Sequence, residues 1–138
     1  MLTPNSKFYI LNSKHMTYKS DLGTYGEDKA CEYLKNKGYK IIERNYRQKW
    51  GELDIVAISP EGILTFVEVK TMRQFGNGAE ELLPEEQMTA AKMKKFKKTS
   101  TLYAQNNEEL INDKGWKCDL VTLTISEKDD TIRHYENI

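Results

Sequence analysis

The sequence predicts an α/β protein whose central mixed β-sheet is flanked by helices, with elements in the order α-β-β-β-α-β-β. Two kinds of signal support this fold class. Two segments open with the capping residues or proline that start helices, and five short runs rich in Ile, Val, Leu, Thr and Tyr are separated by turn signals. With 138 residues, the chain is long enough for one domain with a buried core.

The first helix is expected over residues 24–37. Thr24 suits the N-cap position, Glu27 stands three residues later as in a capping box, and Gly38 follows the last turn. Glu27 also lies at helical spacing from the apolar stripe of this helix, which consists of Ala30, Cys31 and Leu34. Two interpretations of Glu27 remain open: a cap near Thr24, or a carboxylate that faces a functional site.

Five strands are expected, over residues 39–46, 52–59, 63–71, 116–125 and 131–135. The turn signal Ser59-Pro60-Glu61-Gly62 joins the second and third strands into a hairpin. Because side chains alternate between the two faces of a strand, one face of the third strand carries Leu64, Phe66, Glu68 and Lys70. Glu68 and Lys70 are therefore neighbours on that face.

The second helix is expected over residues 84–105, with Pro84 in its first turn and two glutamates beside it at the positive end of the helix dipole. Five lysines spread around this helix: Lys92, Lys94, Lys95, Lys97 and Lys98. Residues 1–22 are polar and are expected to form an extension to a domain over residues 23–138, with Met16 as an alternative natural start.

The balance of 21 basic and 21 acidic side chains gives no overall bias toward nucleic acid. Basic residues are in excess over residues 1–50 and acidic residues over 108–138, so a local basic face is compatible with the neutral total. No membrane span or secretory signal is expected. Cys31 and Cys118 lack metal-ligand spacing and are expected to be buried free thiols in a reducing cytoplasm.

Two strand segments carry the strongest functional signal, Gly51-Glu52-Leu53-Asp54 and Phe66-Val67-Glu68-Val69-Lys70. A carboxylate beside a hydrophobic core is costly unless a cation pairs with it, and Lys70 and a divalent metal are both candidates. Asp54 and Glu68 are positioned to ligate one Mg²⁺ or Mn²⁺ ion, with the Val69 carbonyl and Glu27 as further ligands. Lys70 would orient a water or hold a phosphate oxygen, and this set fits metal-dependent phosphodiester hydrolysis.

These residues also have simpler interpretations. A lone Glu-x-Lys pair in a strand is usually a solvated ion pair, and it is the ordered set with Asp54 and Glu27 that favours a site. Any single lysine of the second helix is expected to be solvated rather than bound to phosphate. The candidate nucleic-acid contacts, taken as a group, are Arg44, Arg47, Lys49, Arg73, Lys92 and Lys95.

Aromatic and polar residues outside these segments are less decisive. Tyr46 and Trp50 flank the turn at Gly51 and are expected either to stack on a base or sugar or to pack in the hairpin. His15 and His134 are assigned to no metal. Asp119, at the start of a strand, is either a structural polar residue or a further acid near the site, and the structural role is favoured.

The ordered residues Glu27, Asp54, Glu68 and Lys70 resemble the PD-(D/E)XK nuclease superfamily, and archaeal Holliday-junction resolvases most of all. Over residues 23–126 the chain is more similar still to the bacterial YraN-like family of nuclease-like proteins. The segments that carry this similarity are residues 26–39, 44–47, 51–54, 66–71 and 118–121. The resemblance implies a restriction-endonuclease-like fold for a nuclease-like domain over residues 23–138, with catalytic roles for Asp54, Glu68 and Lys70 and a supporting role for Glu27.

The sequence therefore favours a cytoplasmic, Mg²⁺-dependent or Mn²⁺-dependent endonuclease that acts on structured or branched DNA. One alternative is a non-catalytic nucleic-acid-binding or recombination and repair accessory protein that keeps the fold. Another is an interaction protein that pairs with a partner through its acidic C-terminal part and edge strand. A resolvase-like activity further implies a homodimer, because a four-way junction has two symmetric cut sites.

Overall fold

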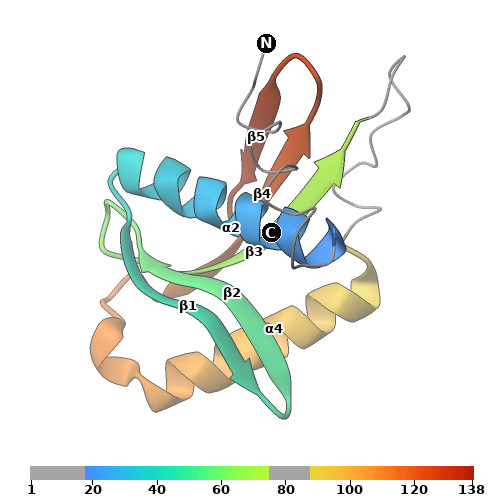
Figure 1. The fold of residues 1–138 in the computed structure, drawn as a ribbon. Helices are drawn as coiled ribbons and strands as arrows, with labels where there is room; N and C mark the ends of the chain where they lie inside the picture. The colour runs from blue at the N-terminus through green and yellow to red at the C-terminus, as the bar shows by residue number, and fades with distance from the viewer. Residues whose placement is uncertain (1–17, 75–87) are drawn as a thin grey trace.

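The computed structural model describes residues 18–74 and 88–138, which form a five-stranded mixed sheet between two helices (Figure 1). The helices are α2 (Tyr18–Asn36) and α4 (Ala90–Asn106), and the short 3-10 helix η1 (Glu108–Leu110) follows α4. The strands are β1 (Lys40–Gln48), β2 (Gly51–Ile58), β3 (Leu64–Arg73), β4 (Trp116–Ile125) and β5 (Asp130–Tyr135). This confirms the predicted α/β class and the predicted order of helices and strands.

The strands lie in the order β1-β2-β3-β4-β5. Neighbouring strands are antiparallel except for β3 and β4, which are parallel. A parallel pair needs a crossover connection, and α4 lies within the connection between these two strands. The predicted hairpin of β2 and β3 and the predicted edge strand β5 are both confirmed.

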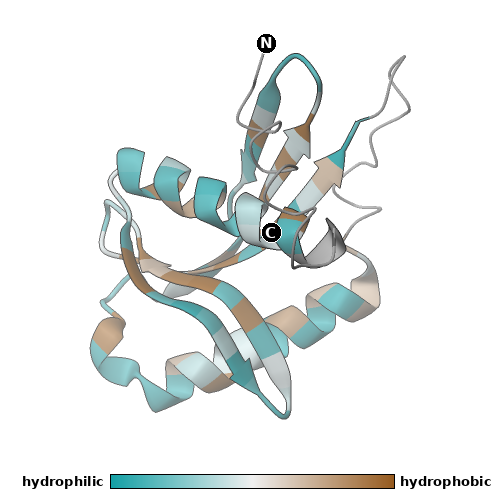
Figure 2. Cartoon of the chain, in the orientation of Figure 1, coloured by the Kyte–Doolittle hydropathy of each residue, from teal (hydrophilic) through white to brown (hydrophobic). Residues whose placement is uncertain are grey.

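Each face of the sheet buries its own hydrophobic cluster. On one face, Leu34 of α2 belongs to a cluster with Val67 of β3. On the other face, Phe96 of α4 belongs to a cluster with Phe66 of β3. Figure 2 shows hydrophobic residues concentrated along the strands, whereas the outward turns of α2 are hydrophilic. α2 and α4 therefore cover opposite faces of the sheet.

The alternation of side chains along β2 breaks at Asp54. Leu53 packs in the cluster on the α4 side, whereas Ile55, two residues later, packs in the cluster on the α2 side. Opposite this point on β1, Asn45 adopts a left-handed backbone conformation with φ of 54°. Asn tolerates this conformation better than most residues. The irregularity places Asp54 at the point where β2 changes the face to which it presents its side chains.

The N-terminal half of α2 differs from the sequence prediction. The helix begins at Tyr18, so Thr24 lies inside it and the capping-box interpretation of Glu27 is wrong. The predicted end is confirmed, since Gly38 has a φ of 93° and its N–H donates to the Lys35 carbonyl at 3.0 Å. Residues 1–17 lie outside the described residues, and the division of the chain after residue 22 stays a prediction.

The start of α4 also differs. Pro84 lies outside the described residues, but Met88 and Thr89 are not helical, so the predicted start at residue 84 is wrong for the helix that carries the lysines. Thr89 is the N-cap, and its side chain accepts a hydrogen bond from the backbone N–H of Lys92 at 3.3 Å.

The two cysteines occupy different hydrophobic clusters. Cys31 lies on the α2 side and Cys118 on the α4 side, and both are buried free thiols, as predicted. Burial raises the pKa of both thiols, which keeps them protonated and unreactive. Among the described residues, no helix has the length and apolar character that crossing a bilayer requires.

Gly51 lets the start of β2 approach α4 closely. A Cβ added at this glycine would overlap the side chain of Thr99, which is buried on α4. We expect Gly51→Ala to lower the free energy of unfolding by about 1–3 kcal/mol because the helix and strand must separate. Urea unfolding measures this. A Cβ at Gly23 of α2 meets nothing within 4 Å, so the control Gly23→Ala should be neutral or stabilising, and equal effects of the two substitutions would contradict the packing account.

Candidate functional site

A cleft begins where β2 and β3 separate. The register of the two strands ends at Ile55 and Val67, although both strands continue beyond this pair. Asp54 and Glu68 are the next residues on the two sides of the opening. The carboxylate of Asp54 takes the place of a strand partner, since its Oδ2 accepts the backbone N–H of Val69 at 2.8 Å. The separation of the strands thus brings the two predicted carboxylates to one place.

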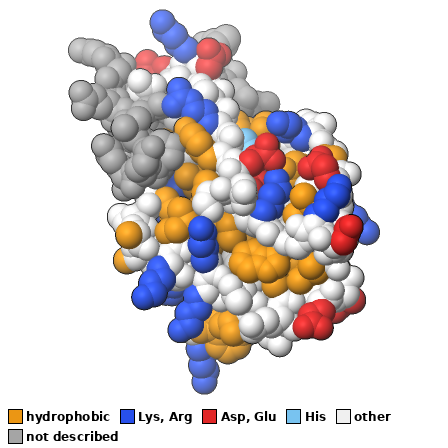
Figure 3. Space-filling model, turned by 180° about the vertical axis from the view of Figure 1, so that it is seen from behind, with side chains coloured by type: hydrophobic (Ala, Val, Ile, Leu, Met, Phe, Trp, Pro, Cys, Tyr) orange, Lys and Arg blue, Asp and Glu red, His pale blue; other side chains and the backbone are white. Residues whose placement is uncertain are grey.

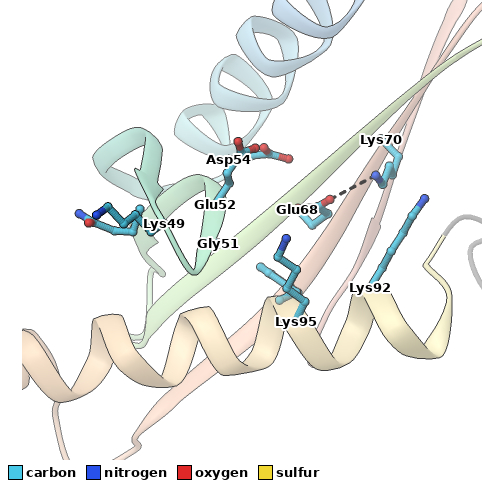
Figure 4. Close-up of a pocket in the computed structure, with 10 residues that line it drawn as sticks. Lys49, Gly51, Glu52, Asp54, Glu68, Lys70, Lys92 and Lys95 are labelled. Carbon is cyan, nitrogen blue, oxygen red and sulfur yellow. Dashed lines mark ion pairs between the residues drawn. The ribbon is translucent and has the colours of Figure 1, made fainter.

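The cleft has a volume of about 380 Å³ and is bounded by the β1–β2 hairpin, β3 and α4 (Figure 4). Its acidic groups come from β2 and β3, and its lysines come from the hairpin, β3 and α4. The lining residues are Gln48, Lys49, Gly51, Glu52, Asp54, Glu68, Lys70, Lys92, Lys95 and Phe96. Carboxylates therefore lie at the strand opening, with four ammonium groups around them.

Glu68 and Lys70 form an ion pair in this cleft. Lys70 Nζ lies 3.3 Å from Glu68 Oε2, the contact drawn as a dashed line in Figure 4. The predicted period of two along β3 is confirmed, because Leu64 and Phe66 on the same face pack in the cluster under α4. The face that is hydrophobic in the first half of β3 thus becomes charged where the strand leaves the core.

Burial dominates the electrostatics of the two carboxyl groups. It raises the pKa of Glu68 to about 7, and the negative charge of Asp54 adds to this while Lys70 opposes it. Burial also raises the pKa of Asp54, whereas the Val69 N–H and Lys70 favour its charged form. Two carboxylates that repel each other in a partly buried cleft form a site where a divalent cation relieves the repulsion.

The raised pKa of Glu68 predicts a pH dependence of stability in the absence of metal. An unfolded Glu has a pKa near 4.5, so the folded state prefers the protonated form. The stabilisation of the folded state by protonated Glu68 is complete below the pKa that Glu68 has in the unfolded state. It is lost as the pH rises through about 7. We expect a loss on the order of 2 kcal/mol between these limits, relative to Glu68→Gln.

Urea unfolding across this pH range, with a chelator present, measures the difference between the wild type and Glu68→Gln. The control Glu61→Gln changes an exposed glutamate in the β2–β3 turn and should keep the wild-type pH dependence. Parallel stability curves for the wild type and Glu68→Gln would contradict the assignment of this shift to Glu68.

Glu27 approaches the same opening from α2. Burial raises its pKa and the charge of Asp54 raises it further, whereas a hydrogen bond with Asn45 and the charge of Arg44 act in the opposite direction. Glu27 does not line the cleft, and Arg44 Nη2 lies 3.9 Å from its Oε1. The structure therefore excludes the interpretation of Glu27 as a helix cap. The other interpretation, a carboxylate that faces the site at Asp54, remains.

A glycine allows α2 to come this close. A Cβ added at Gly26 would overlap the side chain of Thr71 on β3, so the residue before Glu27 must lack a side chain. The two glycines that precede the acidic residues, Gly26 and Gly51, therefore serve close packing of a helix against a strand. A larger residue at either glycine would displace the acidic residue that follows it, Glu27 or Glu52.

Three of the six predicted nucleic-acid contacts line the cleft: Lys49, Lys92 and Lys95. Lys92 and Lys95 are one turn apart on α4 and thus share a face, and both point toward the strands in Figure 4. The remaining lysines of α4 are exposed, as predicted for solvated side chains. Figure 3, which shows the molecule from behind, has Lys and Arg side chains gathered at the lower left of that face, whereas basic and acidic side chains are intermixed at the upper right.

The three predicted arginine contacts lie elsewhere. Arg44 pairs with Asp28 at 2.7 Å on the α2 side. Arg47 is exposed on β1, and Arg73 ends β3, three residues beyond Lys70. None of the arginines lines the cleft. The structure therefore separates a lysine group in the cleft from an arginine group outside it.

A second polar cluster, which sequence reasoning missed, lies on the α2 side of the sheet at β4 and β5. The potential ligand atoms of Asp119, His134 and Glu136 lie within 4.8 Å of one another, so these residues form a possible metal site. His134 Nε2 lies 2.8 Å from Asp119 Oδ2, and the backbone N–H of Asn137 donates to Asp119 Oδ1 at 2.9 Å. Asp119 is completely buried, and the sequence had assigned no metal to either Asp119 or His134.

Lys117 competes with any metal for this cluster. Its Nζ lies 2.7 Å from Glu136 Oε1 and 3.4 Å from Asp119 Oδ2. Burial alone would lower the pKa of Lys117, but the hydrogen bond to Glu136 and the charge of Asp119 outweigh burial and raise it. The signal available in the sequence was the pair Lys117 and Asp119, which share one face of an otherwise uncharged strand.

Other residues that the sequence did not assign complete the first cleft. Glu52 lines it, and its negative charge raises the pKa of Asp54. Gln48 and Phe96 line it as well. Glu52 could have been found from its place two residues before Asp54 in the Gly51-Glu52-Leu53-Asp54 segment, because alternate residues of a strand normally share a face.

The fold and the cleft define a class of α/β protein in which a mixed five-stranded sheet opens between two strands to expose paired carboxylates and a lysine. Residues 26–123 match the model of the family described as Uncharacterised protein family UPF0102, and the chain belongs to this family.

Relatives from three bacteria share most of the length of the chain, and each is described as a UPF0102 protein. The protein of Syntrophomonas wolfei is 37% identical over 117 residues, which cover 85% of this chain and 96% of the relative. That of Alkaliphilus oremlandii is 38% identical over 118 residues, covering 84% and 95%. That of Sulfurihydrogenibium sp. is 37% identical over 121 residues, covering 86% and 94%. The expected YraN-like relationship is thus confirmed as membership of UPF0102.

Proposed function

We propose that the cleft between β2, β3 and α4 hydrolyses phosphodiester bonds of DNA with the help of a divalent cation, Mg²⁺ or Mn²⁺. The observation that supports this most is the pair of partly buried carboxyl groups, Asp54 and Glu68: burial, and then the negative charge of Asp54, raise the pKa of Glu68. Oxygen ligands of this kind suit hard cations. The proposal also places the chain in the PD-(D/E)XK nuclease superfamily, which the order Glu27, Asp54, Glu68, Lys70 resembles.

The carboxylates of Asp54 and Glu68 would hold the cation, and the Val69 carbonyl and Glu27 would act as further ligands. When bound, a divalent cation lowers the pKa of a water molecule and offsets the charge that develops on the phosphate. The hydrogen bond from the Val69 N–H, at 2.8 Å, fixes the Asp54 carboxylate so that one oxygen is oriented in advance.

Lys70 would act on the water or on the phosphate. Its ammonium lies 3.3 Å from the Glu68 carboxylate, so a water or phosphate oxygen beside Glu68 is within its reach. Lys92 and Lys95 line the opposite wall and supply positive charge for the neighbouring phosphates. These lysines favour a polyanionic substrate over a neutral one, and DNA is the substrate that we propose.

An assay of the purified protein with Mg²⁺ or Mn²⁺ tests this function. Labelled four-way junctions, nicked, single-stranded and duplex DNA are incubated with either metal, and with a chelator as the control. The proposal expects metal-dependent cleavage of at least one structured substrate. Binding without cleavage of any of them, under either metal, would overturn hydrolysis and favour the non-catalytic nucleic-acid-binding alternative.

A further inference from the structure

Trp50 is the large hydrophobic side chain that remains exposed among the described residues, with 44% of its surface accessible. The other tryptophan, Trp116, packs edge-on against Phe66 with ring centroids 5.5 Å apart. Tyr46, which also flanks the Gly51 turn, packs edge-on against Tyr103 at 5.0 Å. The core therefore takes up the neighbouring aromatic rings and leaves Trp50 accessible.

The turn that carries Trp50 is held in place. Gln48 and Gly51 pair at the end of the β1–β2 hairpin, so Lys49 and Trp50 form a two-residue connection. Gly51 is buried against Thr99 of α4 with no room for a Cβ. Because the backbone next to Trp50 is anchored, the turn itself loses little conformational entropy when a flat ligand packs against the indole.

The surroundings of Trp50 suit a nucleic acid. Its neighbours in the chain, Lys49 and Gly51, both line the cleft, and Lys92 and Lys95 face the cleft from α4. Figure 4 shows Lys49 at the hairpin end and the two α4 lysines at the opposite wall. Lysines that hold phosphates, beside an exposed aromatic ring that stacks on a base, are an arrangement that binds single-stranded nucleic acids.

We propose that Trp50 stacks on an unpaired nucleobase of the nucleic acid whose backbone enters the cleft. This role rests on the proposed function and narrows its substrate class to nucleic acids with an unpaired base next to the bound phosphates. A base inside a continuous duplex is covered by its neighbours on both sides, so its face is closed to the indole. A single-stranded tail, flap or junction arm leaves such a face open.

Binding is measured in the presence of a chelator, so that no cleavage takes place. The probes are a duplex with a single-stranded tail, the same duplex with blunt ends, and the tailed duplex with abasic sites in the tail. We expect Trp50→Ala to weaken binding of the tailed duplex roughly 5- to 150-fold, and Trp50→Phe to keep most of the affinity because its ring can still stack. Binding of the blunt duplex should change less than about twofold.

Three further measurements distinguish stacking by the Trp50 ring from a loss of the fold or of positive charge. Trp50→Leu keeps an apolar side chain without a ring, and should bind the tailed duplex as weakly as Trp50→Ala. The abasic probe should bind the wild type weakly and Trp50→Ala equally weakly. Tryptophan fluorescence, which reports Trp50 alone in a Trp116→Phe variant because the chain has two tryptophans, should be quenched by the tailed probe.

Equal affinities of the wild type and Trp50→Ala for the tailed duplex would overturn the stacking role, as would the absence of binding by the wild type. Trp50-dependent binding without cleavage in the metal-containing assay would leave stacking in place and overturn hydrolysis alone. Cleavage that is unaffected by Trp50→Ala would leave hydrolysis in place and overturn stacking alone.

Discussion

Asp54→Asn is expected to abolish metal-dependent cleavage while leaving the fold intact. Asn is of equal size and keeps an oxygen that can accept the Val69 N–H, which is 2.8 Å from Asp54 in the wild type. It lacks the negative charge that holds a divalent cation. Because a cation supplies several kcal/mol of transition-state stabilisation, the rate should fall about 10³-fold or more. Single-turnover cleavage of the preferred DNA substrate measures this rate.

Two further variants, Lys70→Met and Asp113→Asn, test whether the loss of cleavage is specific to the carboxylate that holds the metal. Lys70→Met should lose cleavage but keep metal binding, because both carboxylates remain. Asp113 is exposed and does not line the cleft, so Asp113→Asn should cleave at the wild-type rate. Circular dichroism and urea unfolding verify that each variant is folded. A folded Asp54→Asn variant with wild-type activity would show that this carboxylate does not serve the reaction.

Asp119→Ala is expected to cause a large loss of stability. Asp119 is completely buried and accepts hydrogen bonds from the Asn137 backbone and from His134, with Lys117 nearby. Its removal leaves a partly buried ammonium with one carboxylate fewer, and the C-terminal segment loses its anchor. Loss of one partner of a buried ion pair typically costs about 3–5 kcal/mol. Thermal and urea unfolding measure this change.

The neighbouring Glu136 provides the matched control. Its side chain is 56% exposed although it also pairs with Lys117. Exposed ion pairs contribute about 1 kcal/mol or less, so Glu136→Gln should have a small effect. Similar losses for Asp119→Ala and Glu136→Gln would mean that burial does not determine the contribution of this cluster.

Local signals predicted the strands well. The bounds expected for the fourth strand, 116–125, agree with β4, and the Ser59-Pro60-Glu61-Gly62 turn lies between β2 and β3. The period of two placed Glu68 and Lys70 on one face, and their contact at 3.3 Å follows from it. These features depend on residues that are close in the chain, for which periodicity and turn chemistry are informative.

Features that depend on packing between distant segments could not be predicted in this way. β2 changes face at Asp54, opposite the left-handed Asn45 of β1, and no period of two anticipates this. Glu27 matched a capping box in the sequence, but α2 extends back to Tyr18 and excludes that role. The group around Asp119 forms only when β5 pairs with β4 and brings His134 beside it.

If Asp54 and Glu68 form a metal site, calorimetric titration of Mn²⁺ or Mg²⁺ will distinguish the wild type from Asp54→Asn. Glu136→Gln serves as a control for the second possible metal site. We expect the metal to bind the wild type and Glu136→Gln, more strongly above pH 7 where Glu68 is charged, and to bind Asp54→Asn little or not at all. Equal binding to the wild type and Asp54→Asn, or binding lost only in Glu136→Gln, would contradict this expectation.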